Sequence, residues 1–286
     1  MNIRGLHTLL SISQTGSFSV TAEQLNMTLP AVSMQMKALE ENLGQVLFDR
    51  SARPPRLTSE ARAILNDARV ILDAEARIRA GSQNAGALLG RYRIGFIPTA
   101  SVRILPGFLQ RVSTEAPKAE FDTTAGLSAD LARAVLAGTL EGAVVTGGAL
   151  PAGLVCEQIA REPMALAVPE GVGNVAIPAL PDQLPFLQFL PDGGIGRVID
   201  VWLNENTLTP KRRIIFDTVE PIIECLAHGL GYTILPRPDL ERYPEKSFLI
   251  KDLPGKPISR DVVFISREHT MSAAHRAKIL EMMIGD

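Results

Sequence analysis

Residues 16–50 read GSFSVTAEQLNMTLPAVSMQMKALEENLGQVLFDR, and the turns in this stretch divide it into helices. Ser17 is placed to cap a short helix, and Thr28 to cap a longer one that holds Pro30 in its first turn, where proline is tolerated. The longer helix ends at Gly44, and its apolar residues, Val32, Met36, Leu39 and Leu43, fall at helical spacing. The stretch therefore predicts two consecutive helices with a tight turn between them.

The sequence on either side extends this pattern. Before it, residues 3–15 predict another helix, and after it, residues 46–58 predict a short two-stranded wing that bends at Pro54-Pro55. The order of helix, short helix, tight turn and longer helix is typical of a helix-turn-helix, whose last helix enters the major groove of DNA. On periodicity alone, a three-helix packing module with no role in nucleic-acid binding is an equal alternative.

The same residues carry a resemblance to a known family. The stretch is similar to the N-terminal domain of LysR-type transcriptional regulators. The matched motifs are Gly16-Ser17-Phe18, Ala22-Glu23-Gln24-Leu25, Pro30-Ala31-Val32-Ser33, Gln35-Met36-Lys37-Ala38-Leu39-Glu40, Leu43-Gly44, Leu47-Phe48, Arg50 and Leu57-Thr58. Many motifs in one order are far more specific than a single short motif, so the resemblance implies a winged helix-turn-helix that binds DNA.

Three positions depart from the family pattern. Leu29 stands where the family usually has a polar residue, often glutamine, and Met34 stands where arginine is frequent. Ser59-Glu60-Ala61 replaces the usual Pro-x-Gly. Glutamine and arginine hydrogen-bond to base edges, whereas Leu29 and Met34 offer apolar contacts, for example to a thymine methyl group. The operator preferences of better-known relatives are therefore not expected to apply.

Eight side chains are candidates for contact with double-stranded DNA. The outward positions of the third helix, Pro30, Ser33, Met34 and Lys37, are expected to face bases. Ser17, Arg50, Arg53 and Arg56 are better candidates for phosphate, because arginine binds phosphate oxygens readily. Residues 50–93 contain nine arginines and four acidic residues, a local positive excess within a chain whose net charge is −2.

Residues 58–80 contain no glycine or proline and predict one long helix. Its apolar stripe is Ala61, Leu65, Ala68, Leu72 and Ala76, with Ile64, Ile71 and Ile78 on the flank. This stripe can pack on its own domain, whereas the resemblance implies antiparallel pairing with a second subunit in a homodimer or homotetramer. Residues 81–86 are interpreted as a flexible hinge, so we expect a winged domain over 1–58 and a linker over 59–88.

Beyond residue 89, strand and helix patterns alternate, which predicts parallel sheet units with right-handed crossovers. Strands are expected at 92–97, 120–124, 142–146, 165–168, 186–189, 213–216, 231–235 and 261–266. An effector-binding domain over 89–286 would have two subdomains, 89–160 with 267–286 and 161–266, around a cleft. This alternation of strands and helices is similar to that in the effector-binding domain of LysR-type regulators. The predicted fold class is α/β, with an N-terminal all-α winged helix-turn-helix and a C-terminal two-subdomain domain like a periplasmic binding protein.

The carboxyl ends of the predicted strands are candidates for binding a small effector molecule. The residues there are Thr99, Ala100, Ser101, Thr124, Thr146, Gly147, Phe189, Asp217, Thr218 and Val219. Hydroxyl and amide groups at the helix start near residue 99 suit a carboxylate, although the same groups can simply cap the helix. Asp217 would suit an amino group. We therefore expect an organic acid or an amino acid.

The remaining features limit the class of protein. The chain has no apolar run long enough for a membrane span and no secretory signal, and it has two cysteines, which fits a cytoplasmic protein that does not bind membranes. The histidines are scattered, and Gly193-Gly194-Ile195-Gly196 lacks the lysine of a phosphate-binding loop. We expect no catalysis, no metal and no cofactor. The alternative is a solute-binding or catalytic α/β protein with an accessory N-terminal module.

Overall fold

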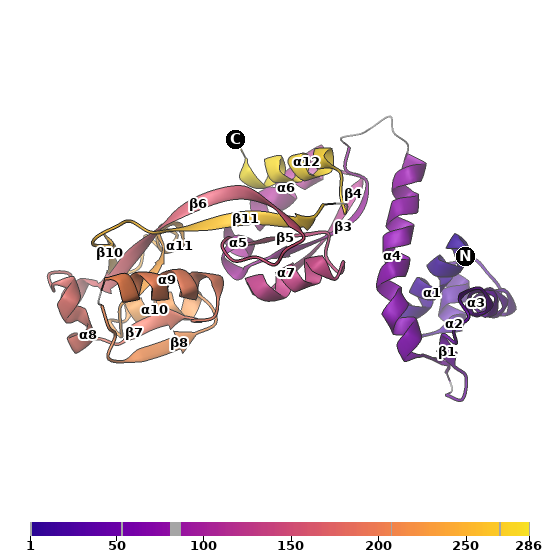
Figure 1. The fold of residues 1–286 in the computed structure, drawn as a ribbon, viewed down its shortest axis with the longest axis horizontal. Helices are drawn as coiled ribbons and strands as arrows, with labels where there is room; N and C mark the ends of the chain where they lie inside the picture. The colour runs from indigo at the N-terminus through magenta and orange to yellow at the C-terminus, as the bar shows by residue number, and fades with distance from the viewer. Residues whose placement is uncertain (1, 53, 81–86, 207, 269, 286) are drawn as a thin grey trace. The chain divides into compact units, whose positions relative to one another are not determined.

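The computed structural model describes residues 2–52, 54–80, 87–206, 208–268 and 270–285. Two candidates from the sequence, Arg53 and the hinge at 81–86, lie outside these residues. The chain divides into two compact units, Met1–Arg91 and Tyr92–Asp286 (Figure 1). Within the described residues, no helix is both long enough and apolar enough to cross a bilayer.

The first unit consists of three short helices, a two-stranded wing and a long helix. In chain order these are α1 (Ile3–Thr15), α2 (Phe18–Gln24), α3 (Leu29–Leu43), β1 (Phe48–Asp49), β2 (Arg56–Leu57) and α4 (Ser59–Ala80). Ser17 and Thr28 cap α2 and α3, because their side-chain oxygens accept hydrogen bonds from the N–H groups of Val20 (3.4 Å) and Ala31 (3.3 Å). Gly44 ends α3 with φ of 65°, a left-handed conformation that favours glycine. The predicted winged helix-turn-helix is confirmed.

The long helix α4 packs along α1 of its own unit. Ala61, Ala68 and Leu72 of the predicted stripe are buried there, in one cluster with Leu9 of α1 and Met36 of α3. Of the two packing partners that the sequence left open for this stripe, the structure shows its own domain. The large apolar side chains of α4 that stay exposed, among those described, are Val70 (37%) and Ile78 (80%).

A seven-stranded sheet organises the second unit. Its strands lie in the order β10–β6–β11–β5–β3–β4, and β9 pairs with β6. They are β3 (Gly90–Phe96), β4 (Ala119–Ala125), β5 (Gly142–Thr146), β6 (Leu154–Pro169), β9 (Thr233–Pro236), β10 (Phe248–Asp252) and β11 (Ser259–Arg267). The first subdomain adds α5 (Pro98–Arg103), α6 (Leu105–Glu115), α7 (Ser128–Leu136) and α12 (Ala273–Ile284) to β3–β5. Helices α6 and α12 cover one face of the sheet, and α7 covers the other (Figure 1).

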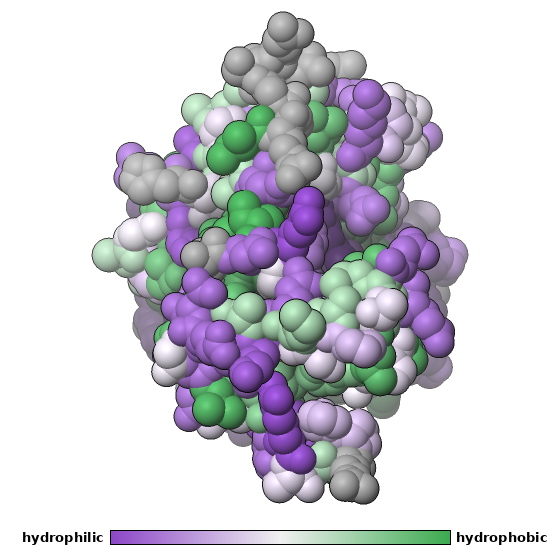
Figure 2. Space-filling model, turned by 90° about the vertical axis from the view of Figure 1, so that its right-hand side faces the viewer, coloured by the Kyte–Doolittle hydropathy of each residue, from purple (hydrophilic) through white to green (hydrophobic). Residues whose placement is uncertain are grey.

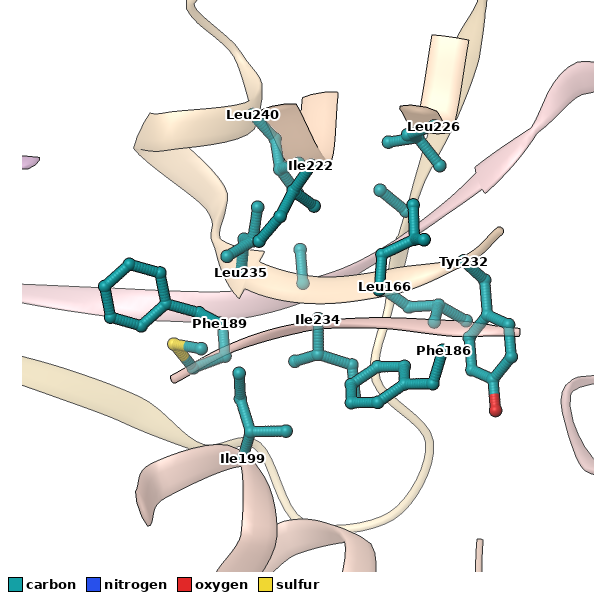
Figure 3. Close-up of a cluster of buried hydrophobic side chains, with 14 of the residues drawn as sticks. Leu166, Phe186, Phe189, Ile199, Ile222, Leu226, Tyr232, Ile234, Leu235 and Leu240 are labelled. Atoms are coloured by element: carbon teal, nitrogen blue, oxygen red, sulfur yellow. The ribbon is translucent and has the colours of Figure 1, made fainter. Parts of the chain in front are cut away.

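The second subdomain is built on a parallel pair of strands, β7 (Phe186–Phe189) and β8 (Arg213–Phe216). Around them lie α8 (Leu180–Gln183), α9 (Gly194–Glu205), α10 (Glu220–Ala227), α11 (Arg237–Leu240) and two short turns of 3₁₀ helix at Glu170–Val172 and Ile177–Ala179. Phe186 and Tyr232 pack together in its core with their ring centroids 5.3 Å apart, and Ile222 belongs to the same buried cluster on the side of Leu235 (Figure 3). Phe186 begins β7 and Phe189 ends it, and both belong to this buried cluster.

The centre of the large sheet differs from the sequence expectation. Strand β6 spans 16 residues instead of 165–168, and β11 pairs antiparallel with both β6 and β5. The predicted parallel pairing is confirmed for β3 with β5 and for β7 with β8. It is wrong for β11, which is antiparallel to β5 and β6, and for β9, which is antiparallel to β6. The first half of β6 has one solvated face, so it lacks the continuous apolar run that marked 165–168. Together β6 and β11 form a ribbon through both subdomains, with a β-bulge where the register shifts between Val262 and Val263 (Figure 1).

Candidate functional site

The first candidate surface is the outward face of α3. Pro30, Ser33, Met34 and Lys37 are all exposed there, Met34 with 73% of its surface, while Val32 and Met36 are buried on the opposite side. The Nζ of Lys37 lies 3.9 Å from an oxygen of Glu41, but both side chains are two-thirds exposed, so this pair holds the lysine weakly. Figure 2 looks onto the side that carries this unit and shows mostly hydrophilic side chains with scattered apolar patches.

Glu40 fixes the wing to the end of α3. Its Oε1 accepts hydrogen bonds from the backbone N–H groups of Leu47 (2.8 Å) and Phe48 (3.1 Å), and its Oε2 accepts one from Nη2 of Arg50 (2.9 Å). The Glu40 side chain is 13% exposed, whereas Arg50 keeps 58% of its surface in solvent. Arg50 is therefore held in place by an intramolecular pair, and the rest of its guanidinium group faces solvent. Glu40 was missed by the sequence analysis, because nothing in the local pattern shows a carboxylate turned toward the wing.

The remaining phosphate candidates lie at the wing and at the start of α2. Arg56 is exposed on β2, directly across from Asp49 on β1. Hydrogen bonds from Ser51 and the positive charge of Arg56 lower the pKa of Asp49. Ser17 is half-buried at the N-terminus of α2, the positive end of the helix dipole.

The second candidate site is a cavity between the two subdomains of the second unit. It is lined by Thr99 of α5, Thr146 of β5 and Phe189 of β7, three of the predicted effector residues. Ser128, Gly194, Ile195 and Arg260 line it as well. None of these was an effector candidate in the sequence, where Gly194 and Ile195 were considered only as part of a phosphate-binding loop and rejected. The space open to the centres of water molecules is about 20 Å³, enough for about one water, so the cavity is nearly closed.

The other predicted effector residues lie outside this lining. Ala100 and Val219 are buried, Thr124 and Asp217 are exposed, and Thr218 is half-buried. The hydroxyl of Ser101 donates to the carbonyl of Ile97 in its own helix (3.2 Å), and the N–H of Gly147 donates to the carbonyl of Asp261 (2.7 Å). The structure thus gathers three of the ten predicted residues into one cavity.

A buried ion network stands behind the cavity wall. Arg260 of β11 is fully buried; its Nε donates to Glu162 of β6 (3.0 Å), its Nη1 to the hydroxyl of Thr99 (3.0 Å), and its Nη2 lies 3.5 Å from Asp239 of α11. Arg103 of α5 pairs with Glu162 (2.5 Å) and Asp239 (2.6 Å). Burial raises the pKa of Asp239, although the two guanidinium groups act against this shift. The network joins α5 of the first subdomain to α11 of the second.

An exposed helix-turn-helix face in one unit and a nearly closed cavity between two α/β subdomains in the other are together typical of transcriptional regulators that bind DNA. Residues 3–62 match the family described as bacterial regulatory helix-turn-helix protein, lysR family, and residues 85–281 match the LysR substrate binding domain. These matches cover most of the chain. The protein belongs to the LysR family of DNA-binding transcriptional regulators.

Relatives and solved structures agree with this assignment. The chain is 28% identical over 269 residues to the HTH-type transcriptional regulator CzcR of Bacillus cereus, covering 94% of this chain and 92% of the relative. It is 29% identical over 255 residues to IlvY of Escherichia coli, covering 86% and 85%. The fold is similar to a Corynebacterium glutamicum OxyR mutant (TM-score 0.70, 21% identity, 99% and 91% covered) and to full-length CbnR in complex with its target DNA (TM-score 0.62, 24% identity, 99% of both chains covered).

Proposed function

We propose that this regulator binds promoter DNA through the exposed face of α3, as a homodimer or homotetramer, and responds to a small organic acid or amino acid held in the cavity of its second unit. It works in the cytoplasm and catalyses no reaction. We divide the chain into the winged domain 1–58, the linker 59–88 and the effector-binding domain 89–286. The observation that carries the DNA-binding part is the exposure of Ser33, Met34 and Lys37 on the helix that the fold presents outward.

Self-assembly is proposed on two grounds. One recognition helix reads few base pairs, and two copies joined by a dyad read two half-sites with a fixed spacing. In addition, α4 leaves Ile78 80% exposed and Val70 37% exposed, whereas its other large apolar side chains that are described pack inward or partly inward. A second copy of α4 would cover these two side chains.

The effector part follows from the geometry of the cavity. An effector larger than about one water cannot enter a space of about 20 Å³ unless the two subdomains separate. A ligand that binds only the widened form shifts the population toward that form, which is the thermodynamic basis of an effector response.

The DNA-binding proposal is tested with a duplex selected by the full chain from a random library. Fluorescence anisotropy should show that Lys37→Ala weakens binding about tenfold or more, in line with about 1–3 kcal/mol for a base contact. Arg56→Ala should lower the slope of log K against log salt by about 0.9 if it neutralises one phosphate. Lys118→Ala, an exposed lysine of the second unit, is the matched control. Retention of duplex binding by a chain without residues 1–80 would refute the proposal.

A further inference from the structure

The cavity between the two subdomains has one charged wall. Of the ten described residues that line it, Arg260 alone carries a charge. Its side chain is fully buried, so this charge was taken out of water at a considerable free-energy cost and is held by partners on three other elements. A guanidinium group at the wall of a cavity that widens when the subdomains separate is the side chain best suited to bind an oxyanion.

Arg260 has a donor left for a ligand. A guanidinium group carries five N–H donors in fixed directions. Nε and Nη2 point to Glu162 and Asp239, and Nη1 donates one hydrogen bond, to the hydroxyl of Thr99. Nη1 carries a second N–H, for which the described residues supply no acceptor. The pairs with Glu162 and Asp239 fix the orientation of the guanidinium group of this cavity-lining residue, so little ordering is needed when a ligand binds it.

Two further features face the same space and favour an acceptor. Thr146 is 95% buried (5% exposed) and lines the cavity, so its hydroxyl is a polar group that a ligand can reach there. Gly194 and Ile195 begin the 12-residue helix α9, whose first turn receives no side-chain cap. Uncapped first-turn N–H groups carry about half a positive charge at a helix N-terminus and bind anions. An oxyanion between α9 and Arg260 would satisfy the amides, the Thr146 hydroxyl and the spare N–H together.

The rest of the lining limits what the anion can carry. Ile97, Leu127, Phe189 and Ile195 offer apolar surface, and none of the ten described lining residues supplies a second positive or a negative charge beside Arg260. Asp217, which would suit an amino group, is exposed and does not line the cavity. A second carboxylate or an ammonium group would therefore be buried against apolar side chains without a partner.

We propose that Arg260 is the residue that selects the effector, and that the effector is a short aliphatic monocarboxylate whose carboxylate binds Arg260, Thr146 and the start of α9. This inference rests on the proposed function and narrows its effector class. The guanidinium groups of Arg103 and Arg260 are already balanced by Glu162 and Asp239, so the α9 dipole and the hydroxyl groups supply the additional stabilisation of the bound anion. The aliphatic chain would lie against Phe189 and Leu127.

The proposal is tested on the full chain with four probes of similar size: isobutyrate, its neutral isostere isobutyramide, the zwitterion valine and the dicarboxylate succinate. Thermal unfolding gives the stabilisation by each probe, and isothermal titration calorimetry gives the Kd. Isobutyrate should raise the Tm, and its Kd should be at least about tenfold lower than those of the other three. Arg260→Lys keeps the charge but loses the fork geometry, and it should weaken isobutyrate binding about tenfold or more. Arg161→Lys, on the exposed face of β6, is the matched control.

The wild-type comparison decides the question even if Arg260→Lys fails to fold. Equal stabilisation by isobutyramide and isobutyrate would overturn the proposal, and so would an unchanged Kd for isobutyrate in a folded Arg260→Lys variant. If valine or succinate binds best and Thr146→Val abolishes that binding, the cavity is the effector site but the monocarboxylate assignment is wrong. If no small organic acid or amino acid binds in a manner sensitive to Thr146→Val, the effector part of the proposed function fails as well.

Discussion

Gly194 lies where the start of α9 meets Thr146 of the other subdomain, and a single methyl group placed there tests whether this contact closes the cavity. A Cβ on residue 194 would lie 2.5 Å from the Cβ of Thr146, 2.7 Å from its Oγ1 and 2.9 Å from its Cγ2. Non-bonded carbon atoms normally lie about 3.5–4.0 Å apart. In Gly194→Ala, the start of α9 must therefore move away from β5 by about 1 Å.

The expected cost follows from the packing. Overpacking a well-filled contact destabilises a protein by about 1–3 kcal/mol, and the better helix propensity of alanine returns up to about 1 kcal/mol. We therefore expect Gly194→Ala to lower the free energy of unfolding of the second unit by about 1–2 kcal/mol. Removal of the opposing side chain by Thr146→Gly in the Gly194→Ala background should recover most of this loss relative to Thr146→Gly alone, because the clash is with Thr146 itself.

Urea unfolding monitored by tryptophan fluorescence measures the loss, since the chain has one tryptophan, Trp202, and it is buried on α9. Gly171→Ala is the matched control, because a Cβ on residue 171 meets no atom within 4 Å and the residue has no left-handed φ. A Gly194→Ala variant as stable as Gly171→Ala would show that α9 does not rest on Thr146. The reasoning about a closed cavity would then be wrong.

Two further substitutions test other parts of the molecule. Glu40→Ala should lower the free energy of unfolding of the first unit by about 2–3 kcal/mol, because the buried N–H groups of Leu47 and Phe48 lose their acceptor. The control Glu41→Ala, at an exposed neighbouring position, should change it by less than about 0.5 kcal/mol. Urea titration followed by circular dichroism measures both values, and equal effects would contradict the role of Glu40 in holding the wing. Burial raises the pKa of Tyr232 to about 12, so the stability tied to its proton is complete below pH 10 and is lost as the pH rises toward 12. Between pH 10 and 11 the wild type should lose about 1 kcal/mol more than Tyr232→Phe, because the unfolded tyrosine passes from half to almost full ionisation while the buried one stays protonated. Parallel losses in the two proteins would contradict this assignment.

The elements set by local chemistry were predictable from the sequence. Ser17, Thr28 and Gly44 act within one helical turn of their own positions, so their roles as caps follow from residue type and order alone. The strand ends at Thr146 and Phe189 were also found, because glycines at 147 and 148 and the stretch from Pro191 to Gly194 mark where each buried apolar run stops.

The parts set by distant pairing were not predictable from the sequence. Arg260 and Thr99 are 161 positions apart, and nothing near either residue shows that a guanidinium group and a hydroxyl meet. The first half of β6 was missed for the same reason, since its strand character comes from pairing with β11 and not from its own apolar pattern. The stripe of α4 was recognised as apolar, but its partner depends on the position of α1, which periodicity does not give.

The two continuous strands β6 and β11 determine how the second unit can deform. A connection made of loops can swing freely, whereas a hydrogen-bonded ribbon resists stretching and yields mainly by twisting and bending about its length. The register of β11 against β6 shifts between Val262 and Val263, within three residues of Arg260, and a bulge interrupts the hydrogen-bond ladder locally, so we expect twisting to concentrate beside the buried ions. We therefore expect amide exchange to be slower along the paired residues of β6 and β11 than in the elements on either side of the ribbon.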